Sequence, residues 1–348
     1  MANLEETVKI ICVVIKMSKV TLEDISAVLD VSKNTVSKAL RGAPGVSEEL
    51  REKIVKLATD MGYKKVLQNK KTINKITIIC RQSFFADVTF WPQVFYGIGH
   101  YANKKNIKLS IENIDETKED KSETFSSITS HPSDGYIIVG TISDVLLKRI
   151  KETNIPVVVV DHFSENIECD YINSSSKTGI YKAIKYLCQN HHKNIGFINN
   201  SISAYSFIER YEAYLKYMKE FNLTVSNDFL WLDAVYIETE YYKNKINSTK
   251  KLKNFPTAWV CVNDTTAITF INALYEMGIK VPDDVSVIGF DNISELLNPG
   301  LTTIDVPKQA MGEKALEQLI YRAENSQVPY TNIILSTQLV ERNSVKKL

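Results

Sequence analysis

The chain has 348 residues, of which 44% are hydrophobic and 24% charged, and its formal net charge is +1. These values exclude disordered and fibrous proteins, and the length suits two or three domains. No apolar run approaches the roughly 18 residues of a membrane helix, and the five cysteines are scattered, without a C-x-x-C pair. We therefore expect a cytoplasmic protein with no disulfide framework, no metal site and no cofactor.

Charge is distributed unevenly along the chain. Residues 17–75 hold twelve lysines and arginines against seven acidic residues, a balance of +5, whereas residues 76–348 sum to −4. A small basic domain joined to a larger, mildly acidic one is typical of a nucleic-acid-binding head on a neutral body. Chance variation also produces differences of this size, so the interpretation depends on local motifs.

Three short helices are predicted in residues 17–64, which we expect to form one domain. Thr21, with an acid three residues later, begins the first helix, Ser32 begins the second and Ser47 begins the third. Two helices joined by a tight turn and braced by a third form a helix-turn-helix, whose second helix enters the major groove of DNA. A three-helix cluster that never meets DNA would bury the same apolar stripes.

The exposed side chains of the second helix are the candidate DNA contacts. Lys33 can donate to guanine edges, and Asn34 can form a bidentate pair with adenine. Thr35 and Lys38 could reach phosphates, which position the helix without reading sequence. The candidate contacts in this domain, with the two capping residues included, are Thr21, Ser32, Lys33, Asn34, Thr35, Ser37 and Lys38.

The motif V-T-L-x-D-I at 20–25, the run V-S-x-x-T-V-S-K-A-L at 31–40 and the closing M-G-Y at 61–63 resemble the DNA-binding head of the lac repressor (LacI/GalR) family. The resemblance implies a transcriptional regulator, most simply a repressor, that binds a palindromic operator as a homodimer, because two-fold symmetry matches paired half-sites. Members of this family usually begin one or two residues before V-T-L. Residues 1–16 are therefore interpreted as an extension, with Met17 as the natural start.

Residues 65–75 are expected to connect the head to the body, and five lysines lie between positions 61 and 75. A run of this kind is commonly a solvated linker. In the resembled family this stretch becomes a hinge helix that wedges a leucine into the minor groove. Here the usual Pro-Asn is replaced by Lys64-Lys65-Val66, so Lys65 and Leu67 are named as candidate contacts, with Ile73 as the alternative wedge.

Short apolar strands alternate with helices through residues 76–348, which predicts parallel sheets wrapped by helices. We expect an α/β body of two doubly wound lobes resembling periplasmic binding proteins, beside the all-α head. Lobe 1 is expected at about 76–172 and 301–325, and lobe 2 at about 173–300 and 326–348. The predicted strands are 76–80, 107–111, 136–139, 157–160, 195–198, 258–262 and 285–290, and the predicted helices are 95–105, 142–153, 178–190, 208–221 and 265–277.

Ligands of open α/β sheets bind beyond the carboxyl ends of the strands, so a cleft between two lobes is the expected site. Asn263-Asp264 follows one predicted strand and Asp291 follows another, and Arg210 stands near the start of a predicted helix. A helix N-cap for Asp264 and a surface position for Arg210 are the ordinary alternatives. The segments around these residues are similar to the family's effector domain, and this resemblance implies that Arg210 and Asp264, followed by Asp291, bond to the effector.

The first loop of the body departs from the family, because Val88-Thr89-Phe90-Trp91 replaces the usual Asn-Pro-Phe-Phe. Aromatic rings at a strand end could stack on the apolar face of a sugar or on a planar ring, and core packing is the alternative. Phe90 and Trp91 are therefore named as candidate effector contacts, and a carbohydrate is the expected effector.

Catalytic motifs are missing from the sequence. Gly97-x-Gly99-x-x-Ala102 loosely matches a dinucleotide fingerprint, but it lies in a helical pattern far from the nearest strand. No phosphate loop, G-x-S-x-G elbow or H-E-x-x-H motif occurs. We expect a regulator rather than an enzyme. A carbohydrate-binding protein without a DNA role is the alternative, and an enzyme of doubly wound fold ranks third.

Overall fold

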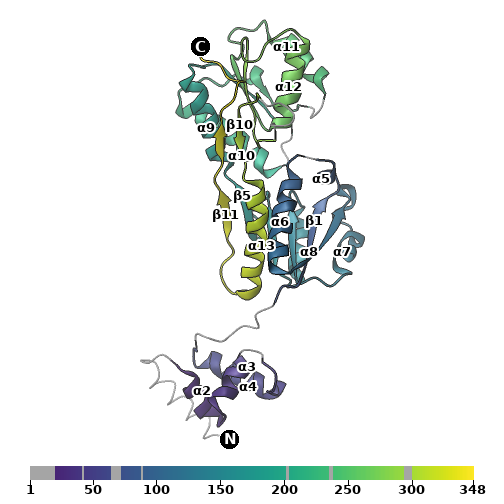
Figure 1. Cartoon of the computed structure of the whole chain (residues 1–348), viewed down its shortest axis with the longest axis vertical. Helices are drawn as coiled ribbons and strands as arrows, with labels where there is room; N and C mark the ends of the chain where they lie inside the picture. The colour runs from purple at the N-terminus through teal and green to yellow at the C-terminus, as the bar shows by residue number, and fades with distance from the viewer. Residues whose placement is uncertain are drawn as a thin grey trace. The chain divides into compact units, whose positions relative to one another are not determined.

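The computed structural model describes residues 20–40, 43–63, 72–87, 89–200, 204–234, 238–293 and 300–348. The chain divides into two compact units, of which one holds the N-terminal helices and the other holds almost all of the rest (Figure 1). The expected extension 1–16, Met17, and the hinge candidates Lys65 and Leu67 lie outside the described residues. Within those residues, no helix combines the length and the apolar character needed to cross a bilayer.

The head consists of α2 (Leu22–Leu29), α3 (Lys33–Leu40) and α4 (Glu48–Asp60). Thr21 begins α2 with a reciprocal capping box, in which its backbone N–H donates to the Asp24 carboxylate at 2.7 Å. The Ser32 hydroxyl caps α3 by accepting the N–H of Thr35 at 3.0 Å. A small core joins the three helices, so the head has the helix-turn-helix architecture. The buried residues of this core are Ile25, Val36, Ala39, Leu40, Ile54 and Ala58.

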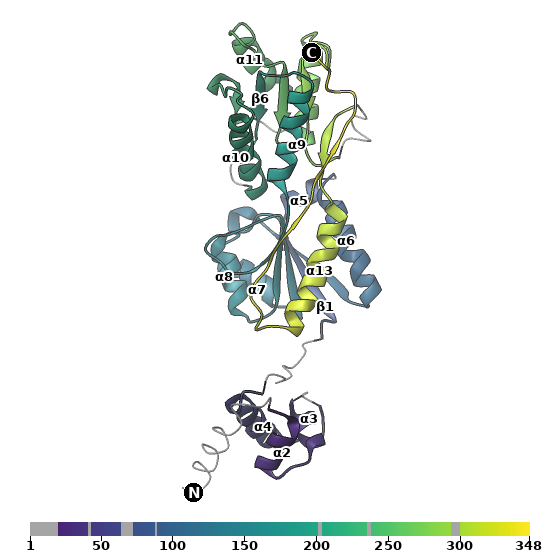
Figure 2. The same ribbon diagram turned by 90° about the vertical axis from the view of Figure 1, so that its left-hand side faces the viewer.

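Lobe 1 of the body is built on a parallel sheet that has six strands within the described ranges, in the order β11-β5-β4-β3-β1-β2. Its central strands are buried on both faces, as their unbroken runs of valine and isoleucine require. Helices cover both faces, with α8 on one and α6 and α13 on the other (Figure 2). The strands are β1 (Lys75–Arg81), β2 (Lys108–Ile114), β3 (Gly135–Val139), β4 (Val157–Val160), β5 (Asp170–Ser174) and β11 (Asn332–Leu335), and the helices are α5 (Ser83–Ala86), α6 (Trp91–Lys105), α7 (Ser122–Thr129), α8 (Asp144–Glu152) and α13 (Lys308–Glu324).

Lobe 2 contains a second parallel sheet, four-stranded in the part of the chain that is described, in the order β7-β6-β8-β9. Its core is aromatic, with Trp231 and Trp259 4.2 Å apart between ring centroids. A short antiparallel pair, β10 with β12, lies in a separate sheet. The strands are β6 (Ile195–Ile198), β7 (Leu230–Trp231), β8 (Ala258–Cys261), β9 (Ser286–Ile288), β10 (Thr303–Asp305) and β12 (Gln338–Val340), and the helices are α9 (Ser176–Gln189), α10 (Tyr205–Glu220), α11 (Thr239–Thr249) and α12 (Asp264–Glu276).

The fold class predicted from the sequence is confirmed: a helical head is followed by two parallel-sheet α/β lobes. The expected division of the body differs from the structure at its C-terminal end. Residues 326–348 were expected in lobe 2, but β11 pairs in parallel with β5 in the sheet of lobe 1. Thr302, expected in lobe 1, instead bridges Ile288 of lobe 2. The division differs because the chain crosses between the lobes more than once.

Gly97 and Gly312 allow α6 and α13 to approach closely. A Cβ atom on Gly97 would overlap the carbonyl oxygen of Gln309, and one on Gly312 would overlap that of Val94. The loose dinucleotide fingerprint therefore lies inside α6, where its first glycine serves helix packing. The N-terminal end of α13 is thereby held next to the loop that begins α6.

Candidate ligand cavity and nucleic-acid interface

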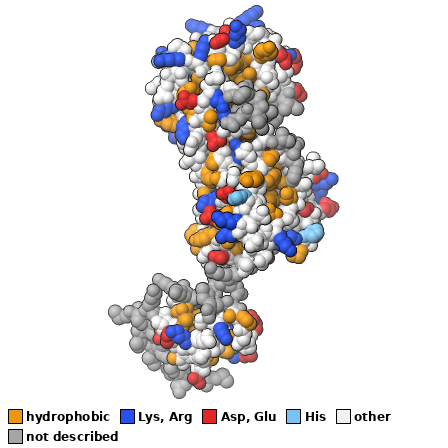
Figure 3. All heavy atoms as spheres, viewed as in Figure 1, with side chains coloured by type: hydrophobic (Ala, Val, Ile, Leu, Met, Phe, Trp, Pro, Cys, Tyr) orange, Lys and Arg blue, Asp and Glu red, His pale blue; other side chains and the backbone are white. Residues whose placement is uncertain are grey.

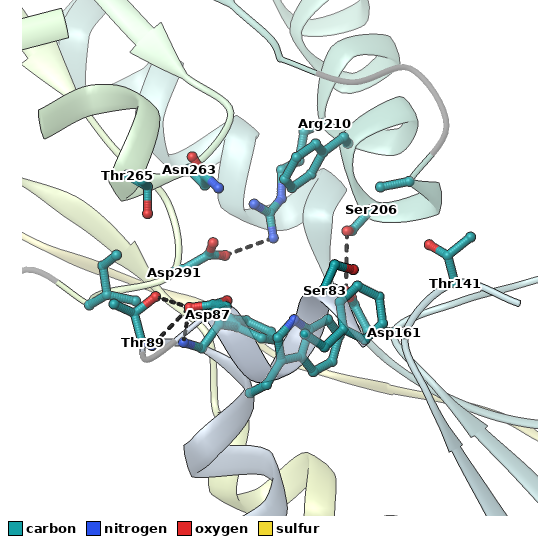
Figure 4. A pocket seen from close by; sticks show the side chains of 17 residues that line it. Ser83, Asp87, Thr89, Thr141, Asp161, Ser206, Arg210, Asn263, Thr265 and Asp291 are labelled. Carbon is teal, nitrogen blue, oxygen red and sulfur yellow. Dashed lines mark hydrogen bonds and ion pairs between the residues drawn. The ribbon is translucent and has the colours of Figure 1, made fainter. Parts of the chain in front are cut away.

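A cavity of about 610 Å³ lies at the carboxyl ends of the strands of the two lobes (Figure 4). Lobe 1 contributes the loops after β1, β3 and β4, and lobe 2 contributes α10 and the loops after β8 and β9. This placement follows the general rule for open α/β sheets. The lining residues are Ser83, Phe84, Asp87, Thr89, Phe90, Trp91, Gly140, Thr141, Asp161, Ala204, Ser206, Phe207, Arg210, Asn263, Thr265, Asp291 and Ile293.

Arg210 and Asp291 form a buried ion pair in the cavity wall, with Nη2 2.9 Å from Oδ1. Nη1 of Arg210 donates to the carbonyl oxygen of Val262 at 2.6 Å, and the guanidinium lies 3.7 Å from the ring centroid of Phe290. The Nε donor of Arg210 has no acceptor among the described residues.

Asp291 occupies a strained backbone position, with φ of 101°. An aspartate in this region costs free energy, which a site tolerates when the surrounding contacts fix the side chain. Here the backbone N–H of Asp291 donates to the carbonyl oxygen of Ile304 at 2.8 Å, and the carbonyl oxygen of Asp291 accepts a hydrogen bond from the buried ammonium of Lys308. Burial lowers the pKa of Lys308. The sequence analysis did not identify Lys308, because α13 was not predicted.

Asp264, which the sequence analysis expected to bond to an effector, is not among the residues that line the cavity. Its side chain is fully buried, and its two carboxylate oxygens accept hydrogen bonds from the Thr303 hydroxyl at 2.5 Å and from the Ile293 N–H at 2.8 Å. Burial raises the pKa of this carboxyl to about 7. The neighbouring Asn263, the extended residue that precedes the helix, lines the cavity instead.

Asn263 also begins α12, since its Oδ1 accepts the N–H of Thr266 at 2.9 Å. The N-cap role that the sequence analysis considered for Asp264 therefore belongs to the preceding residue. Of the two neighbouring residues, Asn263 thus has its side chain at the cavity and Asp264 has its side chain in the protein interior.

Asp161 is a cavity residue that the sequence analysis missed. It directly follows β4 in lobe 1 and accepts a 3.4 Å hydrogen bond from the hydroxyl of Ser206 in lobe 2 (Figure 4). Burial raises the pKa of its carboxyl to about 7, with the carboxylates of Asp291 and Glu209 acting in the same direction and Arg210 opposing them. The signal was present in the sequence, because an acid directly follows the predicted strand 157–160.

Phe90 and Trp91 both line the cavity and pack against other aromatic rings. The ring of Trp91 stacks on Phe84 at 4.6 Å between centroids and meets Phe90 edge-on at 4.8 Å. Each keeps 8% of its surface exposed. The two alternatives predicted from the sequence, ligand contact and core packing, are therefore compatible. Aromatic rings that pack against one another can still present a face to the cavity.

In the head, α3 presents a polar face opposite its buried residues Val36, Ala39 and Leu40. Ser32, Lys33 and Asn34 are exposed, and Thr35, Ser37 and Lys38 are half-buried. Lys33 forms a surface ion pair with Glu23, and Thr21 bonds within its own capping box. The candidate DNA contacts from Ser32 to Lys38 thus lie at the start and on one face of α3, and Thr21 lies at the start of α2.

Comparisons with known proteins match both units. The model of "Bacterial regulatory proteins, lacI family" matches residues 21–66, and that of a "Periplasmic binding protein-like domain" matches residues 184–345. A relative from Vibrio campbellii, described as HTH-type transcriptional repressor PurR, is 30% identical over 334 residues. That alignment covers 94% of this chain and 99% of the relative.

Two solved structures are similar in fold. One is a complex of the transcriptional regulator CelR with cellobiose, with a TM-score of 0.70 and 19% identity. The other is the lac repressor dimer bound to operator and the anti-inducer ONPF, with a TM-score of 0.68 and 20% identity. Each comparison covers 94% of this chain and 100% of the other.

Proposed function

This chain belongs to the lacI family of bacterial transcriptional regulators, and from this premise we propose that a small molecule, of the carbohydrate class, controls its binding to operator DNA. Proteins of this family are transcription regulators and not enzymes. The protein is thus a DNA-binding transcriptional repressor with an effector-binding domain. We place it in the cytoplasm, where its operator is.

The observation that carries the proposal is that residues of both lobes line one cavity. Asp161 of lobe 1 and Ser206 of lobe 2 meet in its wall, so a ligand bound there touches both lobes. We propose that the body has a closed and an open form and that such a ligand binds them with different affinity. The ligand can shift the populations of the two forms only by that difference. We propose that this shift changes how the heads engage DNA.

For the DNA side, we assign the base-reading contacts to the exposed surface of α3. Lys33, Asn34 and Ser37 would face base edges in the major groove. Thr21, Ser32, Thr35 and Lys38 would lie at phosphates and set the position of the helix. Lys65 and Leu67 are proposed as contacts of the connector.

A homodimer on a palindromic operator is part of the proposal. An apolar surface on lobe 1 supports it, formed by Tyr96 of α6 with Leu109 and Ile111 of β2, which are 61%, 39% and 49% exposed. Gly99 of α6 lies near β2, since a Cβ added to it would be 4.0 Å from the Leu109 side chain. Figure 3 shows hydrophobic side chains gathered on the face of lobe 1 that carries α6. A second copy of the chain would cover this surface.

A carbohydrate effector agrees with the size and chemistry of the cavity. Its volume is within the range of sites for small molecules, and an aromatic wall stands beside several hydroxyl and carboxylate groups. We assign effector contact to Phe90, Trp91, Arg210, Asp291 and Asn263. Asp264 is assigned to positioning, because it holds the backbone of Ile293, which lines the cavity.

A gel-shift experiment with the promoter DNA of the protein's own operon tests the proposal. Binding should weaken as salt rises, by about 0.9 log units per log unit of salt for each phosphate neutralised. An effector should then change the fraction of DNA bound at a fixed salt concentration. A carbohydrate-binding protein with no DNA role would give no shift at any salt concentration.

A further inference from the structure

The charged side chains that line the cavity are unbalanced. Asp87, Asp161 and Asp291 contribute three carboxylates, and Arg210 is the sole cation among the described lining residues. Arg210 and Asp291 neutralise each other through their 2.9 Å ion pair. The charges that remain are those of Asp87 and Asp161, and both residues belong to lobe 1.

The charges behind the wall do not reverse this balance. Lys308 and Asp264 are both buried next to the cavity without lining it, and the ammonium of Lys308 donates to the carbonyl oxygens of Asp291 and Val306. The carboxylates of Asp305 and Asp264 both act on the Lys308 ammonium, so its charge is offset behind the wall. The field inside the cavity is therefore set by the lining carboxylates.

The two remaining carboxylates have different roles. Oδ1 of Asp87 accepts hydrogen bonds from the N–H groups of Thr89 and Phe90, at 2.8 and 3.3 Å, and thus shapes its own loop. Asp161 accepts a long 3.4 Å hydrogen bond from Ser206 of the opposite lobe. In Figure 4 the Asp161 carboxylate points toward Ser206 in the cavity. A ligand hydroxyl at this place could donate to it with better geometry.

We propose that this cavity selects an uncharged polyhydroxylated ligand, one of whose hydroxyl groups donates to Asp161, and that it rejects sugar phosphates and sugar acids. The proposal rests on the proposed function of the cavity as an effector site and adds its charge selectivity. A phosphate or carboxylate on the ligand would be repelled by Asp161 and Asp87 in a partly desolvated space, where charge interactions are strong. It would find Arg210 already paired with Asp291.

The test uses the full-length protein and matched ligand pairs in calorimetric titrations at pH 8, above the pKa of about 7 of Asp161. The probes are glucose against glucose 6-phosphate and glucuronate, and ribose against ribose 5-phosphate, with cellobiose as a neutral disaccharide. A neutral sugar should bind, and its anionic counterparts should bind at least about tenfold more weakly. Raising the salt concentration should reduce the ratio of the dissociation constants of the anionic and the neutral ligand, since the rejection is electrostatic.

Asp161→Asn tests the residue itself, because it removes the charge and keeps the shape. The preference for the neutral member of a pair should fall by about tenfold in this variant. Glu165→Gln is the matched control, because it removes one exposed carboxylate from the same loop outside the cavity. Its preference for the neutral ligand should equal that of the unaltered protein. Asp161→Glu retains the charge and should retain the preference.

Three results would overturn the inference. One is tighter binding of a phosphate or uronate than of its neutral counterpart, and another is no binding of any neutral sugar at about 10 mM. The third is an unchanged preference for the neutral ligand in a folded Asp161→Asn protein, which would show that Asp161 does not determine the selectivity. Failure of the proposed function differs from all of these, because it would appear in gel shifts as absent operator binding or as binding that no ligand alters.

Discussion

Arg210 and Asp291, which are 81 residues apart in the chain, form a buried ion pair with a 2.9 Å contact in the cavity wall. Arg210 belongs to α10 and Asp291 follows β9, so the pair ties the helix to the end of the sheet. Removing one partner leaves the other charge buried and unpaired, which is far more costly than the loss of a surface ion pair.

Arg210→Ala should therefore lower the free energy of unfolding of the body by about 3–5 kcal/mol and abolish the response of operator binding to effector. Urea unfolding and gel shifts measure the two effects. Lys216→Ala is the control, because this residue lies on the same helix with 57% of its side chain exposed. It should change stability by less than about 1 kcal/mol. A normal effector response in a folded Arg210→Ala protein would exclude Arg210 from the site.

Asn34→Ala and Lys38→Ala should affect DNA binding in different ways. Asn34 is exposed at the start of α3, and its loss should cost about 1–3 kcal/mol on the operator and little on random DNA, because it is assigned to a base edge. Lys38→Ala should weaken binding to both DNAs and reduce the salt slope by about 1, because it is assigned to a phosphate. Equal losses of Asn34→Ala on both DNAs would contradict its base-reading role.

Asp161 should make the stability of the body depend on pH. Burial raises its pKa from 3.8 to about 7, so the folded state binds the proton more tightly than the unfolded state does. The stabilisation from this proton is complete below about pH 4, and it is lost as the pH rises to about 7. The groups facing Asp161 are Arg210, Asp291, Glu209 and Ser206.

Asp161→Asn removes this contribution, so the stability of the variant relative to the unaltered protein should increase between pH 4 and pH 7 and be constant above. Urea unfolding at a series of pH values measures it. Asp264 has a raised pKa of similar size, so part of the pH dependence should persist in the variant. Glu165→Gln should follow the unaltered protein. A difference between Asp161→Asn and the unaltered protein that does not vary with pH would contradict the raised pKa.

Gly97→Ala and Gly99→Ala form a matched pair on one helix. An added Cβ at Gly97 would overlap the backbone oxygen of Gln309 in α13, and overpacking of this kind costs about 1–3 kcal/mol. At Gly99 the nearest atom, on the Leu109 side chain, is 4.0 Å away. Gly99→Ala should therefore be neutral or stabilising by up to about 1 kcal/mol, through helix propensity. Thermal unfolding compares the two, and equal effects would contradict the close packing of α6 on α13.

The sequence alone was sufficient to predict the head and the alternation of strands and helices in the body. Capping residues such as Thr21 and Ser32 mark helix starts through contacts three residues away, and buried strands such as Val157–Val160 are runs of β-branched residues. Both signals are local, so they can be read without knowing the partners. Strands such as β5, whose sequence D-Y-I-N-S is largely polar, carry no such signal and were missed.

Only the tertiary structure decided which side chains meet in the cavity. Asn263 rather than Asp264 faces it, because the direction of a side chain depends on how α12 is set against the sheet. Asp161 and Ser206 come together from different lobes, and β11 joins the sheet of lobe 1 after the chain has passed through lobe 2. These contacts join residues far apart in the sequence, and their geometry follows from the packing of whole elements rather than from the pattern within any one of them.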